Sequence, residues 1–229
     1  MKIIILFIIL STSIPIVSQN TSEEFLGSWY TYQSNHRLND RFSLSPYGEL
    51  RFYEPSSNYN LAFVSLRGNY HFKSNQTLGF GYAYLDIDTV FEFDKKPNVH
   101  ENRFFEQYTY NHKLGRINVS HRVRLEQRLL NFRARNELQN RFRYCLTLRY
   151  DINKTFYALL REEPFVNFQN QVFHENRLYI GVGIHIMKNS ELHIGYLKQN
   201  IRDNNLNRIQ IGISLKTDHR KNDNSKVSL

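Results

Sequence analysis

Arginine recurs at every second position through much of residues 118–150, opposite a row of apolar side chains. The polar row contains Ser120, Arg122, Arg124, Glu126 and Arg128 in the first half, and Arg141, Arg143, Thr147 and Arg149 in the second. A period of two is typical of a β-strand, because successive side chains of a strand point to opposite faces. An α-helix would spread these arginines around its circumference. The sequence therefore predicts strands with one charged face and one apolar face.

The first residues have the pattern of a secretory signal peptide. Lys2 precedes an unbroken apolar run over residues 3–10, and a cleavage site is expected near Ser18. The run is too short to cross a bilayer as a helix, which takes about 20 apolar residues. We expect export, leaving one domain over residues 19–217 and a polar tail over residues 218–229.

The charge of the chain limits its partners. The formal net charge is +9. Export and the alternation of the arginines within strands argue against a nucleic-acid partner. Anionic lipid headgroups of the outer membrane or a small anionic solute fit better, and ion pairing within the chain is the simplest explanation. The single cysteine, Cys145, excludes an internal disulfide.

Segments with the same alternation follow one another along the chain, as repeated antiparallel hairpins would. We predict an all-β fold, a single antiparallel up-and-down transmembrane β-barrel of about 10 strands, with 12 as the alternative even number. The segments are 26–35, 41–53, 60–72, 76–87, 101–112, 116–130, 139–150, 154–163, 174–187, 191–200 and 207–216. An even count leaves segment 26–35 without a partner, so it either lies outside the barrel wall or pairs with a strand that is not recognised.

The predicted connections alternate in length. Tight turns are expected at residues 73–75, 113–115, 151–153 and 188–190, and longer loops at 54–59, 88–100, 131–138, 168–173 and 201–206. Outer-membrane barrels have short periplasmic turns, long extracellular loops and aromatic residues at the membrane interfaces. Alternation alone does not decide which face is inside, because a soluble lipocalin-like barrel would point its apolar rows inward. Export, loop lengths and aromatic residues beside the tight turns favour the bacterial outer membrane.

Several motifs together resemble one family. They are an early aromatic strand with Trp29, Glu101-Asn102-Arg103, the run His121-Arg122-Val123-Arg124-Leu125-Glu126-Gln127-Arg128, Arg141-Phe142-Arg143-Tyr144 and Gly195-Tyr196-Leu197. The chain resembles the bacterial domain-of-unknown-function family 2490 over nearly all of its mature length. The resemblance implies an outer-membrane β-barrel of unknown function from a Bacteroidetes-type Gram-negative cell. It carries over no catalytic residues.

If the apolar rows face lipid, the charged rows line the bore. Long side chains would largely fill a narrow barrel, and arginine bonds carboxylates bidentately, so we expect an ionic plug with at most a tight passage. Arginines exceed glutamates in this set, so a solute that binds or passes is expected to be an anion. The predicted network contains Glu49, Arg51, Arg67, Glu101, Arg103, Arg122, Arg124, Glu126, Arg128, Arg141, Arg143, Arg149, Arg161, Glu163, Glu175 and Arg177. Small bore-facing residues that leave room for arginines are expected at Gly79, Gly81, Gly181, Gly183 and Gly195.

One four-residue motif occurs twice. His100-Glu101-Asn102-Arg103 recurs as His174-Glu175-Asn176-Arg177, each time after a long predicted loop. Glu and Arg two positions apart share one face of a strand, so each pair can enter the bore. The pairs would either recognise a charged ligand or, more simply, brace the barrel wall.

The enzyme alternative is an outer-membrane lipid hydrolase with a serine and a histidine on the outer surface. Barrel lipases and lipid A deacylases carry His-x-Ser on one strand, and the chain has no His-x-Ser. Ser120 and His121 are adjacent and would point to opposite faces, whereas Ser34-Asn35-His36 has the right separation in reverse order. No metal or nucleotide motif occurs, so no metal or cofactor is expected. A non-enzymatic outer-membrane barrel ranks first, the hydrolase second and a soluble periplasmic ligand-binding barrel third.

Overall fold

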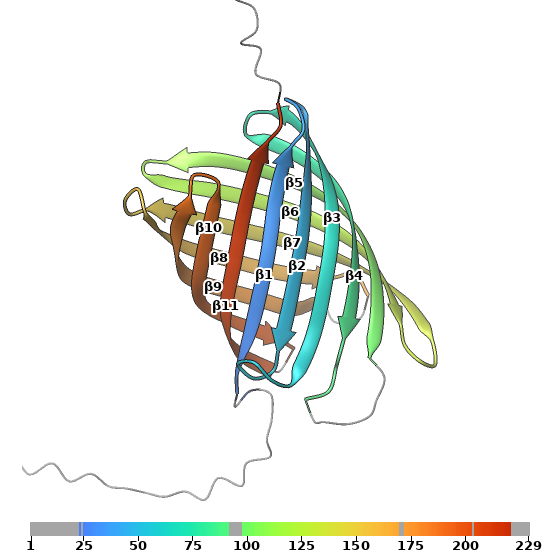
Figure 1. Ribbon diagram of the computed structural model, residues 1–229. Helices are drawn as coiled ribbons and strands as arrows, with labels where there is room; N and C mark the ends of the chain where they lie inside the picture. Colours follow the sequence, from blue (N-terminus) through green and yellow to red (C-terminus); the bar gives the residue numbers. More distant parts are fainter. Residues whose placement is uncertain (1–22, 24, 92–97, 170–171, 203, 221–229) are drawn as a thin grey trace, which may run out of the picture.

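The computed structural model describes residue 23 and residues 25–91, 98–169, 172–202 and 204–220 (Figure 1). The predicted signal peptide, residues 1–18, lies outside these residues, as does most of the predicted polar tail. In the described part of the chain, no helix has the length and apolar character needed to cross a membrane. The strands are β1 (Leu26–Arg37), β2 (Phe42–Phe52), β3 (Tyr59–Lys73), β4 (Gln76–Ile87), β5 (Val99–Leu114), β6 (Ile117–Asn131), β7 (Asn136–Asp151), β8 (Phe156–Asn167), β9 (Phe173–Met187), β10 (Ser190–Ile201) and β11 (Asn204–Asp218).

These strands form one closed barrel, in which consecutive strands pair antiparallel and β1 pairs with β11 (Figure 1). The β1–β11 pair is parallel and runs from Leu26 opposite Asn207 to Arg37 opposite Asp218. An up-and-down barrel with an odd number of strands brings its first and last strands together in the same direction, so a parallel pair must close it. The predicted all-β barrel is confirmed, and the count of about 10 strands is close to the 11 observed.

Segment 26–35 is part of the wall, as β1. It pairs with β2 on one side and with β11 on the other. Both alternatives predicted for this segment are therefore wrong. The even count assumed that the barrel closes through an antiparallel pair, and the parallel pair removes that requirement.

The connections at the two ends of the barrel differ less in length than predicted. The turn end contains residues 38–41, 74–75, 115–116, 152–155 and 188–189, and the loop end contains 53–58, 88–98, 132–135, 168–172 and 202–203. The long loops predicted at 131–138 and 201–206 are wrong, because strand pairing continues to Asn131 opposite Asn136 and to Ile201 opposite Asn204.

The two faces of the wall have opposite chemistry. Outward-pointing apolar side chains such as Val64, Phe80 and Ile180 are more than half exposed. On the inner face, Glu101 and Arg208 are 0% and 1% exposed. A soluble barrel of the predicted kind needs the reverse arrangement, with apolar rows inside. The structure therefore contradicts the basis of the soluble alternative.

Candidate functional site

Glu126 on β6 lies at the centre of the densest charge cluster in the bore. Its carboxylate is 2.7 Å from a guanidinium nitrogen of Arg141 and 2.7 Å from one of Arg143, both on β7. Arg103 and Arg124 approach it to 3.6 Å. The antiparallel register explains the contacts, because Glu126 lies directly opposite Arg141 and Arg124 directly opposite Arg143. One buried carboxylate thus serves four cations, and we call these five residues the Glu126 cluster.

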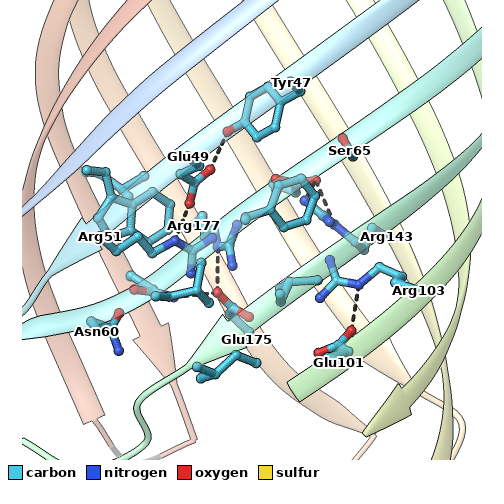
Figure 2. Close-up of a pocket in the computed structure, with 18 of the residues that line it drawn as sticks. Tyr47, Glu49, Arg51, Asn60, Ser65, Glu101, Arg103, Arg143, Glu175 and Arg177 are labelled. Atoms are coloured by element: carbon cyan, nitrogen blue, oxygen red, sulfur yellow. Dashed lines mark hydrogen bonds and ion pairs between the residues drawn. The ribbon is translucent and has the colours of Figure 1, made fainter. Parts of the chain in front are cut away.

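The other buried glutamates extend this arrangement around the wall (Figure 2). Arg128 binds Glu101 through two nitrogens, at 2.9 and 2.7 Å. Glu163 accepts hydrogen bonds from Arg143, at 2.8 Å, and from Arg122. Glu49, shown with its neighbours in Figure 2, accepts from Tyr47 and Arg51.

The two copies of the His-Glu-Asn-Arg motif adopt the same geometry. Arg103 donates to Glu101 at 2.7 Å, and Arg177 donates to Glu175 at 2.5 Å, each within its own strand (Figure 2). Both pairs are on the inner face, and their carboxylates are almost fully buried. This geometry suits the bracing role better than the capture of a ligand, because each carboxylate is already occupied.

The predicted network residues all face the bore, but they do not form one network. Arg149 belongs to a separate cluster at the turn end, with Asp151 at 2.9 Å and Glu191 at 3.0 Å. Arg67 and Arg161 contact no carboxylate among the described residues and instead donate to neutral amides. Arg67 bonds Asn69 at 2.6 Å and Gln107 at 3.2 Å, and Arg161 bonds Gln210 at 2.8 Å. Arg208, which the sequence analysis missed, is buried in the same wall.

Aromatic rings inside the bore are the main feature that the sequence analysis did not predict. The guanidinium carbon of Arg51 lies 3.7 Å from the centre of the Trp29 ring, and that of Arg124 lies 4.3 Å from the Phe105 ring. Further contacts of this kind involve Arg141, Arg143 and Arg177 with Phe165, Arg149 with Tyr157, and Arg161 with Tyr179. Ring faces attract cations, so they stabilise arginines that outnumber the glutamates. Three of the five rings could have been recognised from the alternation, because Phe105, Phe165 and Tyr179 each lie two positions from a charged residue of the inner row, whereas Trp29 and Tyr157 do not.

The bore-facing glycines provide room mostly for these rings. A methyl group on Gly81 would overlap the Phe105 ring, and one on Gly183 would overlap the Tyr157 ring. At Gly181 and Gly195 the crowding side chain is Tyr179. Of the five predicted glycines, only Gly79 has an arginine, Arg67, as its nearest neighbour, so the predicted partner was correct there and wrong at the other four positions. Gly27, which was not predicted, lies against Arg208.

Two cavities occupy the bore. One of about 790 Å³ opens toward the loop end, where Asp88 and Arg202 line it. The other, of about 670 Å³, opens toward the turn end, where Lys113 and Asn118 line it. Seven residues line both cavities and mark the boundary between them, and we call them the boundary residues: Gln33, Tyr47, Arg67, Arg122, Arg161, Gln210 and Ser214. The boundary thus contains three arginines, of which only Arg122 is paired with a glutamate.

The histidines considered for catalysis lie on the outer surface. Ser34 Oγ is 3.0 Å from His36 Nε2, and His36 Nδ1 is 2.8 Å from Thr217 Oγ1. Ser34 itself is only 4% exposed. His121 bonds the Tyr144 hydroxyl at 2.7 Å, whereas the neighbouring Ser120 lines the turn-end cavity. Ser120 and His121 therefore point to opposite faces, and of the two predicted pairs Ser34 with His36 is the one within hydrogen-bond distance.

Comparison with known proteins identifies a solved structure with a similar fold and the family to which the chain belongs. The solved structure of the NanC porin, from a rhombohedral crystal form, is similar over 83% of this chain and 99% of its own, with a TM-score of 0.53 and 14% sequence identity. At this identity the similarity shows a shared fold. No curated protein matches the sequence. The family model described as "Protein of unknown function (DUF2490)" matches residues 26–210, nearly the whole barrel, and the chain therefore belongs to the DUF2490 family.

Proposed function

We propose that this protein is an outer-membrane β-barrel whose bore is a narrow, anion-preferring passage. The exposed apolar face of the wall supports a position in a lipid bilayer, because contact between so large an apolar surface and water is unfavourable. The porin-like fold is consistent with a position in the outer membrane. A purely structural or surface role is the alternative for a barrel whose bore does not conduct.

The observation that carries this proposal is the charge at the boundary between the two cavities. Arg67 and Arg161 stand there with neutral amide partners, so their positive charge is not cancelled locally. Gln107 Oε1 accepts from Arg67 and from two nitrogens of Arg124, and a neutral oxygen thus holds two guanidinium groups together. A small anion that crosses the boundary meets favourable charge, whereas a cation is repelled.

The experiment is a measurement of reversal potential in planar bilayers that contain the purified barrel under a KCl gradient. The wild type is expected to conduct weakly and to prefer chloride. Arg67→Gln and Arg161→Gln should each lower the anion preference by about fivefold, because one unit charge about 4 Å away contributes about 1 kcal/mol even in water. Arg220→Gln, outside the bore beside Asp218, is the matched control. Cation preference, or no conductance at all, would contradict the passage and leave the structural role.

A lipid hydrolase is the second candidate, and the contact between Ser34 Oγ and His36 Nε2 is the observation that favours it. Nucleophilic catalysis needs a base within hydrogen-bond reach of the hydroxyl, which this pair satisfies. The burial of Ser34 weighs against it, since a lipid carbonyl must reach the hydroxyl. Mass spectrometry of phospholipids and lipid A from cells that carry the wild type or Ser34→Ala tests this candidate, and identical profiles would remove it.

A further inference from the structure

The turn end carries an exposed cation at each of its five connections. These cations are Arg41, Lys73, Lys113, Arg116, Lys154 and Lys188, of which Lys113 also lines the mouth of the turn-end cavity. The carboxylates at the same end are engaged elsewhere: Asp151 and Glu191 bind Arg149, Asp218 binds Arg220, and Asp40 is 3.4 Å from Arg220. Within the described part of the chain, none of the six cations has a carboxylate partner. We call these six residues the basic rim.

Apolar side chains accompany the basic rim. Leu114 and Met187, at two different turns, are 68% and 71% exposed, among the highest values for large apolar residues of the barrel. Phe42, Phe72 and Ile152 protrude in the same way from the other three turns. Arg116 also lies over the Tyr150 ring, at 5.0 Å from its centre. Each turn therefore combines a cation with an apolar group that the barrel itself does not cover.

The loop end does not repeat this pattern. Its connection over residues 53–58 carries Glu54 and no cation, and that over residues 168–172 carries no charged residue. The loop end also has exposed cations, Arg133, Arg135 and Arg202, of which Arg135 is paired with Glu137 at 3.4 Å, but they occur at only some of its connections. The basic rim is thus a property of one end of the barrel, and it extends around the whole circumference because the five turns follow one another around the wall (Figure 1).

We propose that the basic rim binds the phosphate groups of anionic phospholipids, with phosphatidylglycerol as the lipid class, while the adjacent apolar side chains enter the acyl region. A membrane surface surrounds the barrel and can contact all five turns at once. A protein partner that docks on one side of the barrel would contact only some of the turns. Lysine and arginine near the end of a membrane span extend toward headgroup phosphates, and aromatic residues anchor at the same level. The inference rests on the proposed membrane location and is independent of conduction.

The test uses the full barrel in neutral detergent, mixed with dioleoylphosphatidylglycerol or with dioleoylphosphatidylcholine. Native mass spectrometry and thermal unfolding report lipid binding. The wild type should prefer phosphatidylglycerol, and each cation removed should weaken that preference by about fivefold, as expected for about 1 kcal/mol per basic residue at an anionic surface. The combined variant Lys73→Gln, Arg116→Gln, Lys154→Gln and Lys188→Gln should lose it. The loop-end variant Arg133→Gln, Arg135→Gln and Arg202→Gln is the matched control and should retain it.

Two outcomes would overturn the inference: equal binding of the two lipids by the wild type, or equal loss in the loop-end variant. If the combined variant fails to fold, as judged by heat-modifiable gel migration, salt applied to the wild type replaces it. At about 1 M salt the screening length is about 3 Å, so the preference should disappear. An anion-selective wild type without a phosphatidylglycerol preference would remove this inference and leave the proposed function standing.

Discussion

The Glu126 cluster and the boundary residues use the same side chain, arginine, in opposite ways. In the cluster, four arginines surround one buried carboxylate, and further glutamates share them. At the boundary, Arg67 and Arg161 are held by neutral amides and face the two cavities. The cluster therefore joins β5, β6 and β7, whereas the boundary leaves positive charge available to a solute.

The difference shows that the partner, and not the arginine, decides the role. A guanidinium that binds a buried carboxylate neutralises the charge of that carboxylate, and removing either group of the pair leaves the other charge uncompensated. A guanidinium bonded only to amides keeps its field, because an amide carries no net charge to cancel it. Counting arginines on the inner face cannot separate these cases, since both kinds belong to the same rows.

The largest effect is expected from Arg143→Gln in the Glu126 cluster. Arg143 contacts Glu126 at 2.7 Å and Glu163 at 2.8 Å, so the change leaves two buried carboxylates short of a partner. We expect a loss of about 3–5 kcal/mol in the free energy of unfolding. Urea unfolding in detergent, followed by heat-modifiable migration, measures it. Asp40→Asn is the control, since that side chain is 88% exposed, and equal stability of the two variants would refute the structural role of the cluster.

The next effect concerns the rings that support the arginines. Gly81→Ala places a methyl group in the space of the Phe105 ring, on which Arg124 rests, and should cost about 1–3 kcal/mol. Gly48→Ala is a matched control on β2, because no neighbouring atom lies within 4 Å of the added carbon. The same unfolding assay compares the two variants. If Gly81→Ala is no less stable than Gly48→Ala, the rings do not hold the inner wall in the way described.

A smaller effect on stability is expected at the boundary. Arg67→Gln removes hydrogen bonds to Asn69 and Gln107 and leaves no carboxylate unpaired. The free energy of unfolding should change by about 1 kcal/mol, the usual net value of such bonds, while the anion preference falls. Measuring both quantities on one preparation sharpens the comparison. A loss of stability as large as that of Arg143→Gln would show that the two regions are not different in kind.

The smallest effect is the response to salt. Raising ionic strength from about 0.1 M to about 1 M shortens the screening length from about 10 Å to about 3 Å, which should weaken the anion preference set by the half-buried boundary arginines that line the two cavities. The buried pairs of the Glu126 cluster are screened much less, so the urea midpoint should move little. Reversal potentials and unfolding curves recorded over the same salt series test this. A midpoint that falls in step with the selectivity would contradict the separation.

The sequence predicted most of the side chains that face the bore, but fewer of the partners that they bind. The alternation around Arg122 and Arg143 predicted which side chains share a face, and the two His-Glu-Asn-Arg motifs predicted Glu–Arg neighbours. It did not predict that Arg149 pairs with Glu191, 42 residues away, or that Arg161 pairs with Gln210, 49 residues away. Those partners depend on how the strands are aligned around the closed wall. The contacts between arginines and inward rings were missed because aromatic residues were considered only as interfacial residues beside the tight turns.

By itself, the sequence determined the strands, because a period of two in polarity is a local property of each segment. It also determined that one face of the wall is charged and the other apolar. The tertiary structure alone decided that β1 closes the barrel in parallel with β11, that the apolar face points outward, and which arginines receive a carboxylate. These features depend on closure and cross-strand register, which join residues far apart in the chain and leave no periodic trace within any one strand.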